Sequence, residues 1–180
     1  MIEPWPTSDS KDLGDYRVFR LWEHRRKSPR TGAEHDFLVL DCRNWVNVLA
    51  LTPDNELIMV EQFRHGTETV ELEIPGGVID TAAEPPLEAG LRELREETGY
   101  EGENGRIIGE VFSNPAIMNN RTYTVLVTNC REKHATEFDH GEDIRTRLVP
   151  VEEAVDMVGK GLIRHSLVVA ALFHYVRNGK

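Results

Sequence analysis

Residues 91–100 read LRELREETGY, and five of these ten side chains are charged. On a helix, which turns about 100° per residue, Glu93, Glu96 and Glu97 fall on one arc and bring three carboxylates within a few ångströms of one another. Like charges at this spacing repel, whereas hard divalent cations prefer oxygen ligands and would relieve the repulsion. The pattern therefore indicates a metal-binding face, and the alternative is a solvent-exposed helix face rich in glutamate and arginine.

The surrounding sequence, GGVIDTAAEPPLEAGLRELREETGY (76–100), resembles the Nudix box. That pattern is Gly, five residues, Glu, seven residues, then Arg-Glu-apolar-x-Glu-Glu-x-Gly-apolar. Glu84, the next seven residues and residues 92–100 match it without a gap, whereas six residues rather than five separate Gly77 from Glu84. The extra residue falls in a loop, DTAA, which leaves the position of Glu84 open but keeps the helical carboxylates in register. A match of this length favours the metal site over the solvent-exposed face.

The resemblance to Nudix hydrolases implies roles for these residues. Glu93 and Glu97 would be the main ligands of Mg²⁺, or of Mn²⁺ in its place, with Glu96 close by, directly or through water. The backbone carbonyl of Gly76 would complete the shell, and Arg92 would orient the glutamates through its bidentate geometry. The metal would bridge a diphosphate and polarise the attacked phosphorus, so Glu96 and Arg92 are also candidate catalytic residues.

A helix is needed to present this cluster, and the sequence predicts one over residues 85–98. Pro85 and Pro86 suit a first helical turn, where a missing N–H costs little, and Gly99 suits the residue after the last turn. Apolar side chains that fall within about 60° of one another are expected to be buried. This expected stripe comprises Leu87, Leu91 and Leu94, together with Thr98.

Strands and two further helices surround this helix in a mixed α/β (α+β) pattern. The first 13 residues are polar with two prolines and are expected to form an irregular tail. Strands are expected at 16–26, 34–42, 45–52, 56–63, 69–78, 105–112, 121–129 and 144–150, the first four as two hairpins, and helices at 151–161 and 165–178. By resemblance, residues 45–180 form a Nudix α/β/α sandwich with a mixed sheet, preceded by an antiparallel β segment over residues 1–44.

Three features outside the box resemble the ADP-ribose and nucleoside diphosphate sugar pyrophosphatases. In that subfamily a strand-rich segment like 1–44 exchanges between the subunits of a homodimer; an intramolecular hairpin that covers the sheet is the alternative. VEQFRHG (60–66) resembles the strand that supplies a phosphate-binding arginine, here Arg64, for which an exposed cation near a strand end is the alternative. Pro115 lies 15 residues after Tyr100, a spacing that resembles the ADP-ribose class, although an ordinary loop proline would also explain it.

The same resemblance places the general base in a mobile loop near the end of the fold. FDHGEDIRTRLVPVEEA (138–154) matches that region, which makes Glu142 the candidate base and Asp143 its substitute; a solvated loop carboxylate is the alternative. An aromatic ring stacked on a purine would contribute about 1–3 kcal/mol. The candidate substrate contacts are Arg43 for a phosphate or sugar, the polar run 119–121, and for stacking Phe37, Trp22, Phe19 or Trp45.

Composition limits the remaining possibilities. A net charge of −10 argues against broad nucleic-acid binding, which needs a basic surface. There is no run of about 18 apolar residues to predict a membrane span, and the start, MIEPWPTSDS, lacks the basic end and apolar stretch of a secretory signal. Only Cys42 and Cys130 occur, which suits a reducing cytoplasm better than a disulfide framework.

These features together predict Mg²⁺-dependent hydrolysis of the diphosphate linkage of ADP-ribose or related nucleoside diphosphate sugars, giving a nucleoside monophosphate and a sugar phosphate. The alternative within the class is a Nudix hydrolase of another nucleotide, either a GDP-sugar-specific enzyme or an RNA 5′-end pyrophosphohydrolase. The alternative outside it is a catalytically silent Nudix domain that senses nucleotides. A silent domain predicts a degraded metal cluster, whereas Glu93, Glu96 and Glu97 are all present.

Overall fold

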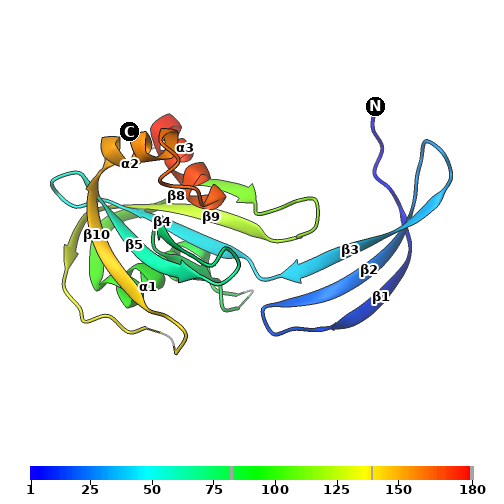
Figure 1. Cartoon of the computed structure of the whole chain (residues 1–180), viewed down its shortest axis with the longest axis horizontal. Coiled ribbons are helices and arrows are strands. Elements are labelled where there is room, and N and C mark those ends of the chain that lie inside the picture. The colour runs from blue at the N-terminus through cyan, green and yellow to red at the C-terminus, as the bar shows by residue number, and fades with distance from the viewer. Residues whose placement is uncertain (82, 139, 179–180) are drawn as a thin grey trace. The chain divides into compact units, whose positions relative to one another are not determined.

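The structure, a computed structural model, describes residues 1–81, 83–138 and 140–178. Position 82 of the DTAA stretch and position 139 of the loop proposed to carry the base therefore lie outside the described residues. The chain divides into two compact units, coloured by residue number in Figure 1. The N-terminal unit comprises Met1–Arg43 with Phe112–Arg121, and the larger unit comprises Asn44–Val111 with Thr122–Lys180.

The N-terminal unit is built on a three-stranded antiparallel sheet in the order β1-β2-β3. Strands β2 (Phe19–Lys27) and β3 (Glu34–Cys42) form the predicted hairpin, with Phe19 opposite Cys42 and Lys27 opposite Glu34. The expectation of an irregular start is wrong, because β1 (Thr7–Asp15) pairs with β2 along its length. Strand β1 is exposed and polar, so its backbone hydrogen bonds hold it in place and the side chains give no period-two signal.

The larger unit contains two sheets, in the orders β7-β4-β9-β8 and β10-β5-β6. The strands are β4 (Trp45–Ala50), β5 (Glu56–Arg64), β6 (Thr69–Glu73), β7 (Gly76–Val78), β8 (Tyr100–Phe112), β9 (Arg121–Glu132) and β10 (Ile144–Pro150). The predicted hairpin between 45–52 and 56–63 is wrong. Strand β4 runs parallel to β9 in one sheet, while β5 lies between β10 and β6 in the other, and only Leu51 and Leu57 form an isolated bridge.

The predicted strand at 69–78 is two strands in different sheets. It breaks after Glu73 because Pro75 has no N–H to donate to a ladder. The carbonyl of Pro75 instead accepts a hydrogen bond from the Val48 N–H at 2.7 Å. Ile74 and Pro75 therefore carry the chain from the sheet of β5 to the sheet of β4.

Helices cover both faces of the strands, which confirms the predicted α/β/α sandwich. They are α1 (Pro86–Thr98), α2 (Val151–Gly159) and α3 (Ser166–Asn178), and Figure 1 shows α1 on the opposite side of the strands from α2 and α3. Alternate residues of β4 serve the two cores, as the period of a strand requires. Val48 packs in the core that contains Leu94 of α1, whereas Leu49 packs in the core of α2 and α3.

Helix α1 lies close to the sheet because Gly90 has no side chain. A Cβ at Gly90 would fall 3.1 to 3.3 Å from methyl groups of Val125, Val46 and Val48. This contact turns Leu91 outward, where it is 38% exposed, so the predicted buried stripe is wrong at that position. Leu94 and Thr98 are buried as predicted, and Leu87 is partly buried against the same core.

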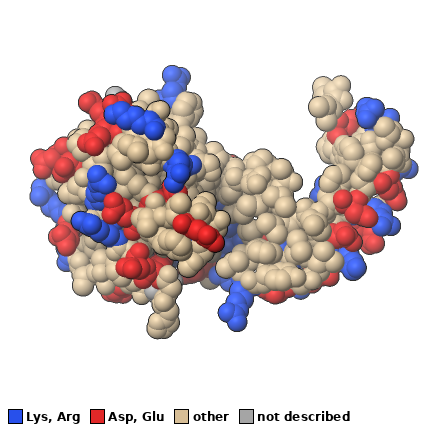
Figure 2. All heavy atoms as spheres, viewed as in Figure 1, with Lys and Arg blue, Asp and Glu red and all other residues tan. Residues whose placement is uncertain are grey.

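One face of the molecule shows charges of both signs (Figure 2). On the face drawn in Figure 2, Lys and Arg side chains alternate with Asp and Glu on both units and do not gather into a single basic area. Within the described residues, every helix is too short or too polar to cross a membrane.

Candidate active site

Two of the clustered glutamates face the interior. Glu93 and Glu97 are only 9% and 3% exposed. The Glu97 Oε2 accepts a hydrogen bond from the Gly76 N–H at 2.9 Å, and a Cβ on Gly77 would collide with the Glu93 carboxylate. The Gly-Gly pair of β7 therefore lets the backbone lie directly against the carboxylates of α1.

Burial changes the acidity of both groups. It raises the pKa of Glu93 to about 7, against the opposing attraction of Arg92. It raises the pKa of Glu97 to about 8, although the hydrogen bond from the Gly76 N–H acts in the other direction. The charge of Glu142 raises both pKa values further. The positive charge around these two carboxylates is too small to keep them fully ionised at neutral pH.

Arg92 connects the remaining carboxylates of the cluster. Its Nε donates to Glu84 at 3.1 Å, and its Nη1 donates to Glu93 at 2.9 Å and to Glu96 at 3.0 Å. The hydrogen bond from Arg92 holds the pKa of Glu84 below its usual range. Arg92 thus hydrogen-bonds three glutamates at once, Glu84 among them despite the extra residue in the preceding loop, whereas Glu97 is held by the Gly76 N–H instead.

The donor set suits a hard divalent cation. Among the described residues, no three His, Cys, Asp or Glu side chains converge closely enough to hold a metal ion as they stand. Glu93 and Glu96 are instead drawn to Arg92, and Glu97 to the Gly76 N–H. Carboxylate oxygens that burial keeps partly protonated are nevertheless suitable ligands for Mg²⁺ or Mn²⁺, because the cation would supply the missing positive charge.

The cluster opens into a cavity of about 420 Å³ that most of the candidate site residues share. Arg64 and Glu142 line it together with Gly76, Arg92 and the glutamates of α1. Its other lining residues are Trp45, Gln62, Gly77, Val78, Asp80 and Glu137. Sequence analysis missed Gln62, Asp80 and Glu137; Gln62 could have been found, because it lies two residues before Arg64 on the same face of a strand.

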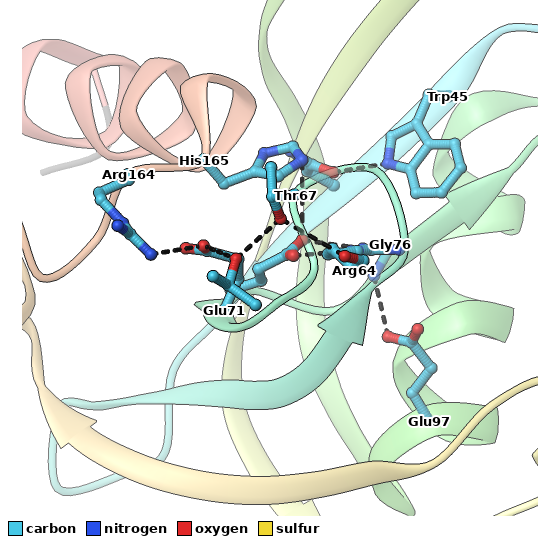
Figure 3. Close-up of polar contacts among 11 residues, drawn as sticks. Trp45, Arg64, Thr67, Glu71, Gly76, Glu97, Arg164 and His165 are labelled. Carbon is cyan, nitrogen blue, oxygen red and sulfur yellow. Dashed lines mark hydrogen bonds and ion pairs between the residues drawn. The ribbon is translucent and has the colours of Figure 1, made fainter.

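Arg64 is held by a carboxylate that sequence analysis did not single out. Its Nε donates to Glu73 Oε1 at 2.7 Å and its Nη2 donates to Glu73 Oε2 at 2.8 Å. This hydrogen-bonded pair raises the pKa of Arg64 above its ordinary value. Figure 3 shows Arg64 together with the Glu97–Gly76 hydrogen bond and the neighbouring Glu71–Arg164 pair. With a side chain 31% exposed, Arg64 is a fixed wall of the cavity rather than a free surface cation.

The lining of the cavity distinguishes between the two candidate bases and includes one candidate for stacking. Glu142 lines it and is half-buried, whereas Asp143 is exposed and is not a lining residue. Trp45 also lines it, and the indole Nε1 donates to Asn47 Oδ1 at 2.8 Å, which fixes the ring. The structure therefore favours Glu142 over Asp143, and it places one of the four stacking candidates in the cavity wall.

The remaining substrate-binding candidates belong to the N-terminal unit. Phe37 is 40% exposed and makes an edge-to-face contact with Trp5 at 5.7 Å between ring centroids. The carbonyl of Arg43 accepts a hydrogen bond from Asn120 at 3.0 Å. The other members of this group are Phe19, Trp22, Pro115 and the run 119–121. Their roles in substrate binding stay predictions.

Comparison with known proteins agrees with this fold and motif. The NUDIX domain family matches residues 42–172. An ADP-ribose pyrophosphatase of Mycobacterium tuberculosis (strain ATCC 25618 / H37Rv) is 31% identical over 137 residues, which cover 74% of this chain and 66% of the relative. An ADP-ribose pyrophosphatase of Bacillus subtilis (strain 168) is 33% identical over 114 residues, which cover 63% of this chain and 61% of that relative. The matched region thus spans somewhat less than two thirds of these relatives.

A solved structure matches the fold over nearly its whole length. The crystal structure of an ADP compounds hydrolase superposes with a TM-score of 0.85, covering 98% of this chain and 95% of that one, at 19% sequence identity. At that identity the likeness concerns the fold. The match of the NUDIX domain family to most of the chain, together with the box that begins at Gly76 and Gly77, shows that this chain belongs to the NUDIX family.

Proposed function

We propose that the protein hydrolyses the diphosphate linkage of ADP-ribose or related nucleoside diphosphate sugars, with Mg²⁺ or Mn²⁺ as cofactor. One observation carries the proposal: a single cavity combines the buried carboxylates Glu93 and Glu97 with a fixed cation, Arg64, and a further carboxylate, Glu142. A diphosphate needs cations on both sides, and water needs a base. The names of the two ADP-ribose pyrophosphatase relatives support the choice of substrate.

Glu93 and Glu97 would hold the cation, with Glu96 beside them and the Gly76 carbonyl as a further ligand. When bound, the cation supplies charge neutralisation and polarises the attacked phosphorus. Arg92 would keep the carboxylates oriented, and Arg64 would bind a phosphate oxygen across the cavity. The pairing of Arg92 with Glu84 and Glu93 supports this orienting role.

Glu142 would act as the general base. It would take a proton from water as the water oxygen forms a bond to one phosphorus and the bond from that phosphorus to the bridging oxygen breaks. The products are a nucleoside monophosphate and a sugar phosphate. The position of Glu142 in the cavity wall, where its charge acts on both buried glutamates, supports this assignment.

The assembly we propose is a homodimer formed through the N-terminal strands, and the protein is expected to act in the cytoplasm. The exposed apolar side chains of β3 support the dimer, because Phe37 and Leu38 are 40% and 49% exposed in the single chain. Such side chains on a sheet favour burial against a second copy.

A substrate panel tests the activity. Phosphate release would be measured with added phosphatase and Mg²⁺ for ADP-ribose, GDP-mannose, UDP-glucose, NADH, diadenosine polyphosphates and nucleoside triphosphates, for the wild type and for Glu97→Gln. We expect turnover of ADP-ribose or another diphosphate sugar, lost in the variant because one buried ligand is removed.

Two other outcomes would contradict the proposed substrate or the proposed enzymatic activity. Turnover confined to triphosphates or capped RNA would contradict the choice of substrate and the role given to Arg64. Tight nucleotide binding by the wild type without any turnover would replace the enzyme with a nucleotide sensor.

A further inference from the structure

Arg64 is clamped along one edge of its guanidinium. The two oxygens of Glu73 accept from Nε and Nη2 at 2.7 and 2.8 Å, the parallel geometry of a bidentate pair. The Glu73 side chain is 4% exposed, while that of Arg64 is 31% exposed. The carboxylate is therefore the buried anchor, and the guanidinium is the part that reaches the cavity.

This clamp leaves donors for a ligand. A guanidinium carries five N–H groups, and Glu73 takes two of them. The N–H groups of Nη1 and the second one of Nη2 lie on the other edges of the planar group. Glu73 thus fixes the plane of Arg64 without using the donors that a phosphate would need.

Arg64 also borders a second cavity, into which its side chain could turn if Glu73 did not hold it. A second cavity of about 540 Å³ is lined by Arg64 as well, with Thr67, Thr69, Glu71 and Arg164 among its other lining residues. Glu71 is a buried carboxylate on the same face of β6, two residues before Glu73. Its carboxylate already accepts a hydrogen bond from Thr69 at 2.6 Å. It also accepts one from Arg164 at 2.7 Å (Figure 3).

We infer that Glu73 is a positioning residue for diphosphate binding: it fixes the plane of the Arg64 guanidinium at the wall of the carboxylate cavity and prevents it from turning further into the neighbouring cavity, which Arg64 also borders. The inference rests on the proposed function, because it assigns Arg64 to a phosphate of the substrate. It goes further by assigning the position of that arginine to one buried carboxylate outside the Nudix box. Glu73 Oε2 also lies 3.8 Å from His165 Nε2, but the role assigned to Glu73 is exerted through Arg64.

Glu71 provides a matched control. Glu71 and Glu73 lie on one strand and one face, both are buried, and each pairs with an arginine, but Glu71 pairs with Arg164. Replacing each by glutamine removes the same charge from nearly the same place. A purely structural role predicts equal effects of Glu71→Gln and Glu73→Gln, whereas a positioning role predicts a loss of affinity in Glu73→Gln alone.

The readout is the Kd of a methylene analogue of ADP-ribose, in which CH₂ replaces the bridging oxygen, measured by calorimetry with Mg²⁺. KM and kcat for ADP-ribose and the thermal midpoint of each variant accompany it. We expect Glu73→Gln to raise Kd and KM by about tenfold or more, because misplacing a binding group by about 1 Å has effects of this size. Glu71→Gln should change Kd by less than about twofold, as expected for a site that touches no ligand.

Two further variants make the test decisive. Arg64→Ala should raise Kd by itself, and adding Glu73→Gln to it should change Kd by less than about twofold, because the two residues act as a unit. Arg64→Lys leaves the buried glutamate intact and keeps the charge but cannot form the two-point pair, so it should lose affinity as Glu73→Gln does. It serves as the test if Glu73→Gln does not fold.

The inference would be overturned if Glu71→Gln and Glu73→Gln raised Kd equally, or if the effects of Arg64→Ala and Glu73→Gln on binding were additive in the double variant. Wild-type affinity in Arg64→Lys would also overturn it. Failure of the proposed function looks different. A wild type that binds the analogue but hydrolyses no diphosphate sugar contradicts the proposed activity, while the comparison of Glu73→Gln with Glu71→Gln still decides the role of Glu73.

Discussion

At the scale of single residues, the raised pKa values of Glu93 and Glu97 predict how metal binding depends on pH. If Glu93 and Glu97 are the ligands proposed above, protons and the cation would compete for the same oxygens, so the affinity for Mg²⁺ should rise as the pH passes through about 7 and about 8. Calorimetric titrations with Mg²⁺ from acid to alkaline pH, in buffers of different ionisation enthalpy, would measure both affinity and proton release. An affinity that does not change over this range would contradict the assignment of these two ligands.

The same two residues predict the stability of the metal-free protein. Their pKa values are higher in the folded chain than in the unfolded one, where the ordinary value is 4.5. The stability they contribute is therefore fully present below the unfolded pKa and is lost as the pH rises through the folded values of about 7 and about 8. Thermal midpoints measured in EDTA should fall over this window, and less steeply in Glu97→Gln. Added Mg²⁺ should reverse the fall; equal slopes for the variant and the wild type would argue against this account.

At the scale of elements, the glycine that ends α1 should matter more than other helix-end glycines. Gly99 has φ of 74°, and a Cβ there would collide with the His134 carbonyl. We expect Gly99→Ala to lower the free energy of unfolding by about 2 kcal/mol or more, through left-handed strain plus the collision.

Two other glycines separate these causes. Gly161 has φ of 69° with open space around it, so alanine there should cost only about 1 kcal/mol. Gly159 has open space and no such φ, so Gly159→Ala should be neutral or slightly stabilising. Urea unfolding of the three variants would show the order, and equal losses would refute it.

The individual helices and strands differ in how well the sequence predicts them. The predicted range of α1 agrees with the observed helix to within one residue, and the predicted ranges of β3 and β10 agree with the observed strands, because proline, glycine and apolar periodicity mark these elements in the sequence. Strand β1 could not be predicted, since it is mostly polar and exposed on both faces and lacks the apolar alternation that marks a strand. The change of sheet at Pro75 depends on tertiary pairing with Val48, which no local pattern encodes.

The candidate site was predictable where chemistry is local in sequence. Glu93, Glu96 and Glu97 share one helix, so spacing alone brings them together. The burial of Glu93 and Glu97 was not predicted, because it requires the glycines of β7 to lie against α1. The clamp on Arg64 could not be predicted, because Glu71 and Glu73 alternate with apolar residues in TVELEI, a pattern that predicts a solvent-exposed polar face rather than a buried carboxylate.

At the scale of the whole molecule, the proposed dimer can be tested by one matched pair of substitutions. Light scattering after size exclusion should give about twice the 20.5 kDa chain mass for the wild type. Phe37→Ser should shift the protein toward the monomer mass, because it removes an exposed apolar side chain of the N-terminal strands. Leu148→Ser, at 39% exposure against 40% for Phe37 but in the larger unit, should not. A monomeric wild type, or the same shift in both variants, would contradict a dimer built through the N-terminal strands.

The passage of the chain between its two sheets limits how such sequences can diverge. Glu73 holds Arg64, and three residues later the N–H of Gly76 holds Glu97. A codon gained or lost between them would displace one half of the cavity against the other. The DTAA stretch comes after both positions, and there this chain carries one residue more than the family pattern. Length changes should therefore accumulate after Val78 in descendants of this sequence and be eliminated between Glu73 and Gly76.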